Sequence, residues 1–235
     1  MISVDLHLHT CHSFDCATPL DEVVHASQRS GLDCVAVTDH NTIEGALRLR
    51  ESTDLRIIVG QEVGTSDGEL IGLFLSEPVP RGLTAIETIA RIKEQGGLVC
   101  IPHPLGRRRF HANSKVGSIE NGQVTLSRAV RRANRLLTDD VLTRVDMLET
   151  INSRTPFKGT WRAISRLADL YGLPVTAGSD SHTAREIGRA RVVMPDFTDA
   201  ASFLAAIRDA RPSGETSSLF IHFASMYARL SRRLC

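Results

Sequence analysis

The chain has 235 residues, a length that suits one large α/β domain. Hydrophobic residues make up 42% of it and the formal net charge is +1, so it can bury a proper core and lacks the charge of a general nucleic-acid-binding surface. No apolar run reaches the roughly 18 residues that span a bilayer. The first residues show no signal-peptide pattern and the five cysteines lack CxxC spacing, so we expect a cytoplasmic protein.

Strand-like runs recur along the chain, and helical patterns lie between most of them. The runs cover residues 2–6, 34–38, 56–62, 70–75, 98–101, 145–150, 174–177 and 189–194. The clearest helical patterns cover residues 19–30, 84–95 and 157–171, and each is followed by a glycine. Strands that alternate with helices favour parallel pairing, and seven or eight such units favour a closed or nearly closed barrel. The active site of such a barrel lies at the C-terminal strand ends.

Two segments fall outside this alternation. Residues 105–126 are polar and loop-like, and they carry three consecutive arginines. Because this segment directly follows His103, we expect it to be an active-site loop that hangs over the site. We expect the barrel to occupy residues 1–211. Residues 212–235 show helical spacing and basic side chains, which predicts a closing helix on the barrel, with a membrane-surface or partner helix as the alternative.

Side chains that bind metals gather in five short clusters, each at the predicted end of a strand. The nine candidate ligands are His7, His9, Asp15, His40, Glu62, Glu69, His103, Asp180 and His182. A lone histidine would carry little weight, but five such clusters at successive strand ends predict a multinuclear metal site. Imidazole is a borderline-soft ligand and carboxylate a hard one, so the mixture suits Zn²⁺, Mn²⁺ or Fe²⁺.

Local spacing supports this hypothesis. His7 and His9 alternate along a strand, so both side chains point to one face, and Asp180 and His182 repeat this spacing later in the chain. Gly178 lets the backbone come close to the site. His103 lies between two prolines, which favour an extended turn after its strand.

The motifs together resemble the PHP (polymerase and histidinol phosphatase) superfamily. They are Asp5-Leu-His-Leu-His-Thr10, Thr38-Asp-His-Asn41, Pro102-His-Pro104 and Gly178-Ser-Asp-Ser-His182. The resemblance covers about residues 1–194. It implies an α/β fold of the distorted (β/α)7 barrel type with two or three metal ions at the C-terminal strand ends, and it implies phosphate-ester hydrolysis.

The resemblance also implies how the ligands are shared. A first ion falls to His7, His9, Glu62 and Asp180. Glu62 bridges to a second ion, which His103 also holds. Asp15, His40 and His182 take a third. Several trinuclear relatives have a histidine where this chain has Glu69, so the second site should be harder and more tolerant of Mn²⁺ or Mg²⁺.

Hydrolysis of a phosphate ester needs an activated water and neutralised charge on the phosphoryl group, and paired metal ions do both. We therefore predict a metal-dependent phosphoesterase that uses a metal-bound hydroxide. The residues predicted to take part directly in catalysis are Glu62, Asp180 and His182. The residues predicted to bind the phosphorylated substrate are Arg107, Arg109, Arg185 and Asn152.

Several functions stay open at this stage. The leading hypothesis is hydrolysis of a small phosphorylated metabolite or nucleotide, without a stable nucleic-acid complex. A 3′–5′ exonuclease of the kind found in polymerase-associated PHP domains is the second, although the net charge of +1 counts against it. A non-catalytic metal-binding regulatory module and hydrolysis of a non-phosphate bond are the others. Aromatic residues make up only 5% of the chain, and no base-stacking pair is evident. The substrate and the oligomeric state cannot be predicted.

Overall fold

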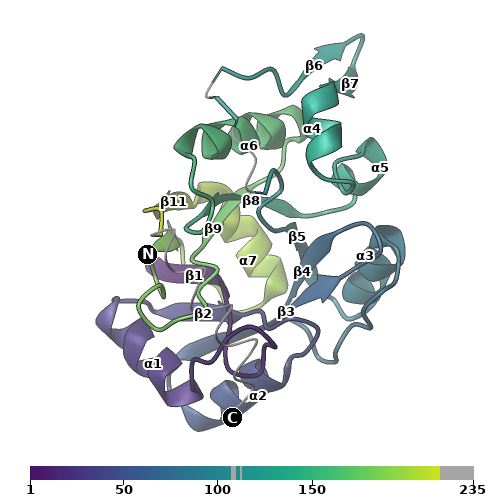
Figure 1. The fold of residues 1–235 in the computed structure, drawn as a ribbon. Helices are drawn as coiled ribbons and strands as arrows, with labels where there is room; N and C mark the ends of the chain where they lie inside the picture. Colours follow the sequence, from purple (N-terminus) through teal and green to yellow (C-terminus); the bar gives the residue numbers. More distant parts are fainter. Residues whose placement is uncertain (107–109, 112, 218–235) are drawn as a thin grey trace.

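The protein is described by a computed structural model that covers residues 1–106, 110–111 and 113–217. Nine strands form one sheet in the order β11-β10-β1-β2-β3-β4-β5-β8-β9. They are β1 (Ile2–Leu8), β2 (Cys34–Val37), β3 (Arg56–Gly64), β4 (Glu69–Leu73), β5 (Leu98–Ile101), β8 (Met147–Asn152), β9 (Val175–Gly178), β10 (Ala190–Met194) and β11 (Arg211–Gly214). The seven strands from β1 to β9 curl into a nearly closed barrel (Figure 1), which confirms the predicted fold.

The barrel closes where the chain leaves β9 and returns to β1. The amide of Asp180 donates to the carbonyl of His7 at 2.7 Å, and the amide of His9 donates to the carbonyl of Ser181 at 3.0 Å. These two bonds join the C-terminal end of the first barrel strand to the segment that follows the last one. They also bring two of the predicted ligand clusters into direct backbone contact.

Not every strand runs as expected. β1, β2 and β3 pair in parallel, as do β5, β8 and β9, but β4 is antiparallel to both of its neighbours. A tight turn causes this, because the amide of Thr65 donates to the carbonyl of Gly68 at 2.8 Å and sends the chain straight back along β3. Outside the seven, β10 pairs antiparallel with β1, and β11 pairs antiparallel with β10.

The three predicted helices are present. α1 (Leu20–Arg29) starts after Pro19, α3 (Ala85–Glu94) starts at a capping box, and α6 (Lys158–Tyr171) ends at Gly172. Gly172 has a φ of 64°, which favours glycine as the helix end. The other helices are α2 (Glu44–Ser52), α4 (Arg128–Ala133), α5 (Asp139–Leu142), α7 (Ala200–Ala206) and the 3-10 turn Ile207–Asp209.

The prediction of an active-site loop at residues 105–126 is wrong for the second half of that segment. Strands β6 (Gly117–Glu120) and β7 (Gln123–Leu126) form a hairpin there, which projects from the molecule beyond α6 and α4 (Figure 1). Asn121 and Gly122 both have positive φ, at 51° and 77°, as the two central residues of a tight hairpin turn require. The hairpin therefore does not cover the metal cluster. Residues 107–109 and 112 lie outside the described residues.

The segment predicted to be a helical tail begins with a strand. Residues Arg211–Gly214 form the edge strand β11 on β10, so the sheet runs past the expected boundary at residue 211. Pro212 is tolerated there because an edge strand can spare one backbone donor. Residues 218–235, to which the rest of the helix prediction applies, lie outside the described residues. Among the described residues, no helix is long and apolar enough to cross a membrane.

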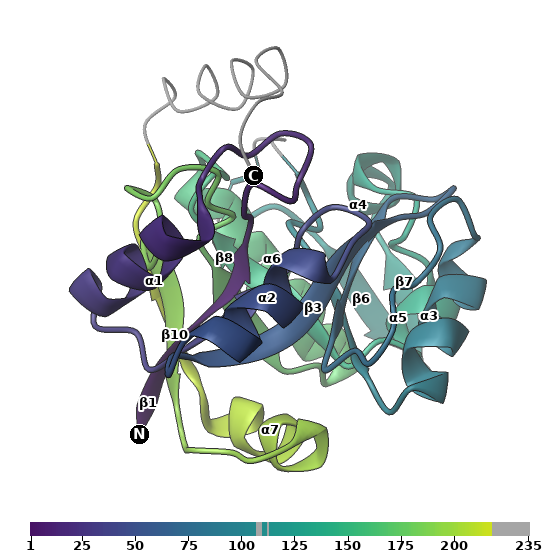
Figure 2. The same cartoon turned by 90° about the horizontal axis from the view of Figure 1, so that it is seen from below.

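Two apolar layers flank the barrel strands. An outer layer lies between the strands and the covering helices, and Val35, Val37 and Ile164 belong to it. An inner layer fills the barrel and includes Val4, Leu6, Ala36 and Met147 together with Phe203 of α7. Figure 2 shows α7 below the starts of the strands, at the end of the barrel opposite the loop after β1. The inner core therefore occupies the N-terminal end of the barrel and leaves the C-terminal end for other side chains.

Candidate metal centre

Irregular pairing in β1 turns the first two histidines into the barrel. Val4 and Leu6 face the inner layer, but Leu8 belongs to the outer one, and the register with β2 shifts between Asp5 and Leu8. Without this shift, residues of odd number would point outward throughout the strand. The shift lets His7 and His9 point inward, and both are fully buried.

The first group of ligand atoms gathers around the Nε2 atoms of His7 and His9, which lie 3.2 Å apart. Glu62 Oε2 lies 3.4 Å from each of them. Asp180 Oδ1 lies 3.7 Å from His7 Nε2 and 3.4 Å from His9 Nε2. The four residues that were predicted to hold a first ion are therefore brought together.

The second group shares Glu62. His103 Nε2 lies 3.2 Å from Glu62 Oε1, and His40 Nδ1 lies 3.3 Å from Glu62 Oε2. Glu69, whose side chain is 45% exposed, approaches both imidazoles at 4.0 Å. Glu62 thus uses its two carboxylate oxygens on different neighbours, which is the arrangement expected of a bridging ligand.

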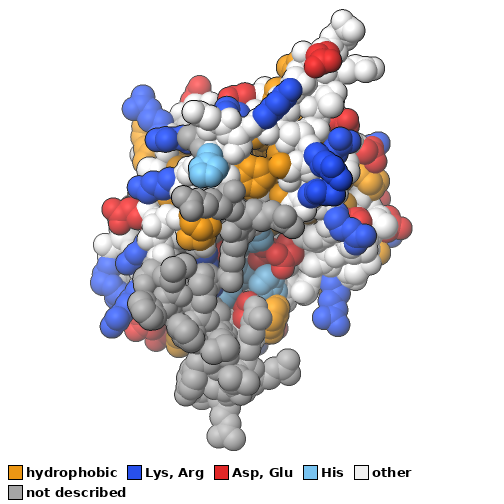
Figure 3. Space-filling model, turned by 45° about the horizontal axis from the view of Figure 1, so that its top comes forward, with side chains coloured by type: hydrophobic (Ala, Val, Ile, Leu, Met, Phe, Trp, Pro, Cys, Tyr) orange, Lys and Arg blue, Asp and Glu red, His pale blue; other side chains and the backbone are white. Residues whose placement is uncertain are grey.

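The third group lies on the side of the loop after β1. Asp15 Oδ2 is 3.2 Å from His182 Nε2 and 3.5 Å from His40 Nε2. The imidazoles of His9, His40 and His182 also lie close enough to share one ion. All nine predicted ligands therefore converge on one region, where Figure 3 shows acidic and histidine side chains together near the centre of the face.

Electrostatics in this cluster are strongly coupled. Burial lowers the pKa of His9 to about 3, and the neighbouring His182 and His40 add to the effect. Burial also acts against the charged form of His40 and His103. Asp15 and Glu62 outweigh it at His40, and Glu62 outweighs it at His103, so that both pKa values are raised to about 9. Glu62 has a pKa well below its ordinary value because His7 and His103 outweigh the effect of its burial.

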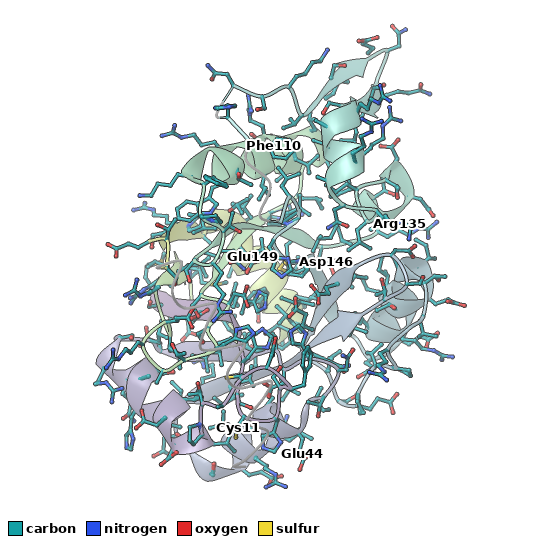
Figure 4. All side chains as sticks on the ribbon, viewed as in Figure 1. Cys11, Glu44, Phe110, Arg135, Asp146 and Glu149 are labelled. Carbon is teal, nitrogen blue, oxygen red and sulfur yellow. The ribbon has the colours of Figure 1, made fainter. Side chains whose placement is uncertain are left out.

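Glu149 supports the cluster and was not predicted. Its Oε1 lies 3.0 Å from His7 Nδ1, and its Oε2 accepts the amide of His103 at 2.7 Å. A carboxylate at Nδ1 places the proton there, so that Nε2 of His7 presents its lone pair to the cluster. Figure 4 shows Glu149 near the centre of the fold, on β8. Its sequence context, a strand residue 142 positions from His7, carries no signal of this contact.

Gly178 makes room for that contact. A Cβ on Gly178 would lie 2.3 Å from the Cβ of His7 and 2.8 Å from Glu149 Oε1. No larger side chain fits there without displacing one of the two. The expectation that Gly178 permits a close approach of the backbone is confirmed.

A buried ion pair holds the segment that carries His182 in place. The guanidinium of Arg154, whose side chain is 8% exposed, donates to both oxygens of the buried Glu186 at 2.8 and 2.9 Å. Glu186 also accepts the amide of His182 at 3.1 Å and the hydroxyl of Thr183 at 3.0 Å. The pair fixes the backbone that carries His182. Sequence reasoning missed both residues, because they lie 32 positions apart and outside the motifs.

The predicted substrate-binding residues have different settings. Asn152 is buried, and its amide donates to Glu149 Oε2 at 3.0 Å and to Asp180 Oδ2 at 3.2 Å. Arg185 is exposed on the turn that follows His182. Arg107 and Arg109 lie outside the described residues. The substrate role of these four residues stays a prediction.

The donor set fits divalent metal ions. Imidazole nitrogens and carboxylate oxygens converge with their lone pairs directed at one another, an arrangement that costs free energy unless a cation or protons lie between them. Hydrogen bonds to Glu149 and to the carbonyl of Asp180 occupy the Nδ1 atoms of His7 and His182 and leave both Nε2 atoms for the cluster. Mixed nitrogen and oxygen ligands suit Zn²⁺, Mn²⁺ or Fe²⁺.

Comparison with known families agrees with this site. The profile of the PHP domain matches residues 5–167, and that of a PHP-associated region matches residues 162–212. The chain belongs to the PHP family. An uncharacterized protein of Methanocaldococcus jannaschii is 39% identical over 116 residues, which cover 44% of this chain and 68% of that protein.

Solved structures share the fold. A two-domain protein from Bacteroides vulgatus that contains a predicted PHP-like metal-dependent phosphoesterase superposes with a TM-score of 0.65 at 15% identity, over 97% of this chain and 69% of that one. A lesion-specific endonuclease from Pyrococcus furiosus superposes with a TM-score of 0.59 at 15% identity, over 90% of this chain and 57% of that one. At these identities the likeness extends to the fold alone.

Proposed function

We propose that the protein is a metal-dependent phosphoesterase that hydrolyses a small phosphorylated metabolite or nucleotide. The observation that carries the proposal is the shared position of Glu62, which lies within 3.4 Å of His7, His9, His40 and His103 through its two oxygens. One carboxylate between four imidazoles is the arrangement by which a protein holds neighbouring divalent ions. Such ions, when bound, activate water and neutralise charge on a phosphoryl group.

The chain's own residues would divide the work. Glu62 and Asp180 would balance the positive charge of the ions and keep them close together. His182, whose Nδ1 lies 2.9 Å from the carbonyl of Asp180, would present Nε2 beside Asp15 on the outer side of the cluster. Asn152 would keep the Asp180 carboxylate in place through its amide. Arg107, Arg109 and Arg185 are proposed to bind the substrate's phosphate oxygens.

The experiment is a metal count followed by an activity screen. The purified chain would be analysed for bound metals and then assayed with Mn²⁺ against several phosphomonoesters and one diester. Two or three equivalents of metal with phosphate release are expected. Metal without release from any ester would contradict the phosphoesterase and favour a regulatory module or hydrolysis of another bond. No metal would contradict the site itself.

A nuclease is the second candidate, and one surface feature favours it. Arg128, Arg131, Arg132 and Arg135 are all exposed, and none forms an ion pair with another described residue. Leu136, next to Arg135, lies against Gly68, the residue just before Glu69. The C-terminal end of this basic stretch therefore lies near the turn that leads into Glu69. An oligonucleotide degradation assay decides, and the paired replacement of Arg131 and Arg132 by alanine should weaken only oligonucleotide cleavage.

A further inference from the structure

A buried carboxylate on β1 lies beside the metal centre without belonging to it. Asp5 is fully buried and lies two residues before His7, yet it is in none of the groups of described residues that could hold an ion. It also forms no ion pair with another described residue. A buried carboxylate costs desolvation free energy unless its oxygens are hydrogen-bonded. The contacts that offset this cost therefore indicate what Asp5 does.

Three backbone amides donate to Asp5, and they use both of its oxygens. Oδ1 accepts the amide of Ser179 at 2.9 Å and that of His7 at 3.3 Å, and Oδ2 accepts the amide of Gly188 at 2.9 Å. A backbone N–H group donates and does not accept, so each of these contacts requires an acceptor on Asp5. The ionised carboxylate, which only accepts, satisfies all three amides at once.

Two of these amides belong to the ligand set predicted for the first ion. His7 is a member of it, and Ser179 directly precedes Asp180, whose amide donates to the carbonyl of His7 at 2.7 Å. Asp180 has a φ of 52°, a backbone conformation that a residue with a Cβ keeps only when its surroundings hold it. Asp5 therefore fixes the spacing of His7 and Asp180, whose Nε2 and Oδ1 atoms lie 3.7 Å apart.

The third amide closes the segment that follows His182. Gly188 has a φ of 78°, and a Cβ there would lie 2.8 Å from the Cβ of Ser30, so this position needs glycine. The bond from Gly188 to Asp5 anchors the far end of the segment, while Glu186 accepts the amide of His182 at its near end. Asp5 thus ties β1 to the residues on either side of the last ligand cluster.

We propose that Asp5 is a positioning residue of the metal centre, which sets the distance between His7 and Asp180 through backbone amides and binds no ion itself. The inference rests on the metal centre of the proposed function, but it does not depend on which ester is hydrolysed. Ligands that are not held in place must be ordered when the ion binds, and the affinity for the ion falls accordingly.

Asp5→Asn tests the proposal with the smallest change of shape. An asparagine side chain has one acceptor oxygen where the carboxylate has two, so its NH2 group would face a backbone N–H whichever way it is turned. The affinity for Mn²⁺, measured on the full chain by competition with a chelator, should fall about tenfold or more, as for other residues that orient a ligand. Thermal unfolding of the same samples gives the folded fraction, to which bound metal is referred.

Asp39→Asn is the matched control, because it removes the same charge but keeps its hydrogen bonds. The oxygens of Asp39 accept the amide of Thr10 at 2.6 Å and its hydroxyl at 2.7 Å, and an asparagine can accept the first and donate to the second. Burial raises the pKa of Asp39 to about 6, with hydrogen bonds from Thr10 and the charges of His40 and His182 acting against it. Because Asp39 interacts with these two imidazoles, loss of charge alone should weaken metal binding at least as much here as in Asp5→Asn.

A spectroscopic measurement separates the position of the ligands from the stability of the fold. The visible absorption bands of bound Co²⁺ depend on the geometry of its ligands. Asp5→Asn should change these bands in the Co²⁺-saturated protein, whereas Asp39→Asn should keep them. Bands that stay unchanged in Asp5→Asn, or an affinity loss no larger than that of Asp39→Asn, would each overturn the positioning role.

The remaining outcomes are also decisive. Asp5→Ser, which keeps one acceptor oxygen in a smaller side chain, replaces Asp5→Asn if that variant does not fold, and it should show the same losses. Failure of both variants to fold would make Asp5 a residue of the fold alone and overturn the proposal. No metal in the wild type would contradict the metal centre and the proposed function together. The expected losses without hydrolysis of any ester would support the role of Asp5 while the phosphoesterase fails.

Discussion

The two ends of the barrel are built from the same strands but serve different purposes. At the N-terminal end, Val4, Leu6 and Met147 of the strands belong to the same buried apolar cluster as Phe203 of α7. At the C-terminal end, the same strands β1 and β8 point His7 and Glu149 inward. The first end supplies the free energy that holds the second together, because buried histidines and carboxylates cost desolvation free energy when no cation is present.

The change from apolar to polar interior occurs at irregular pairing. β1 shifts register between Asp5 and Leu8, and β8 shifts between Glu149 and Ile151. Shifts of this kind re-aim side chains without ending the strand. A regular strand would keep one chemistry along its whole inner face. The barrel can therefore hold a packed core and a polar site on the same few strands.

Removal of a ligand from the polar end should have the largest effect on function. Asp180→Ala or His7→Ala should abolish hydrolysis and lower the bound metal, while the apolar end keeps the protein folded. Activity, elemental analysis and thermal unfolding would be measured together. Asp196→Ala, which removes an exposed carboxylate near the other end, is the control and should keep full activity. Full activity in both ligand variants would show that the site lies elsewhere.

Replacement of a large side chain at the apolar end should lower the stability of the fold and leave metal binding unchanged. Phe203 is fully buried and lies edge-on to Phe197 at 5.0 Å and to Phe74 at 5.3 Å. Phe203→Ala should lower the free energy of unfolding by about 3–5 kcal/mol, since it leaves a cavity. Urea unfolding measures this, and metal bound per folded molecule should stay unchanged. Lost metal in the folded fraction would mean that the two ends are less independent than the structure indicates.

Loss of the Glu149 carboxylate, which supports His7, should lower the metal affinity of the polar end without abolishing metal binding. Glu149→Gln keeps the shape but removes the charge that holds His7 in the required tautomer. Metal affinity should fall about 10–100-fold, as for other residues that orient a ligand. Competition with a chelator measures the affinity. Glu120→Gln in the exposed hairpin is the matched control. Unchanged affinity in Glu149→Gln would show that His7 needs no such partner.

The candidate ligands of the polar end and the main helices could be predicted from the sequence. The nine candidate ligands were predicted because their clusters lie in short motifs near predicted strand ends, which parallel strands bring to one edge. The three long helices were predicted from their apolar spacing and their glycine stops. These are local signals, and local signals survive in a single sequence.

The features that the sequence analysis missed depend on contacts between distant residues or on turn signals that it did not consider. The direction of β4 follows from the tight turn at Thr65, and the β6–β7 hairpin follows from Asn121-Gly122, a turn signal inside a segment interpreted as a loop. Glu149 and Glu186 act on histidines through contacts that exist only after folding. The inward direction of His7 depends on a register shift that no periodicity reveals.

The pH dependence of metal binding should show how strongly the carboxylates raise the pKa values of the histidines at the polar end. In the metal-free protein, Asp15 and Glu62 raise the pKa of His40 to about 9 against the effect of burial, and Glu62 does the same for His103, so both imidazoles are protonated at neutral pH. Metal binding must displace these protons, and the apparent affinity should therefore rise as the pH rises towards 9. Each displaced proton contributes about a tenfold gain per pH unit. Metal titrations between pH 7 and 9 measure the slope, and a flat profile would contradict the coupling.

The smallest effect is expected at Glu69, where the polar end meets solvent. Its carboxylate is half-exposed, lies 4.0 Å from His40 and His103, and has a raised pKa because of the negative charge of Glu62. Such a ligand adds little to a site that His103 and Glu62 already define. Glu69→Ala should therefore reduce the metal content by one ion at most and lower activity only a few-fold, whereas Glu69→His should favour Zn²⁺ over Mn²⁺ because imidazole is the softer ligand. Metal analysis and the ratio of activities with the two ions test both variants. A complete loss of activity in Glu69→Ala would make this half-exposed carboxylate as essential as the buried ligands, and the second ion would then depend on the rim of the barrel rather than on its interior.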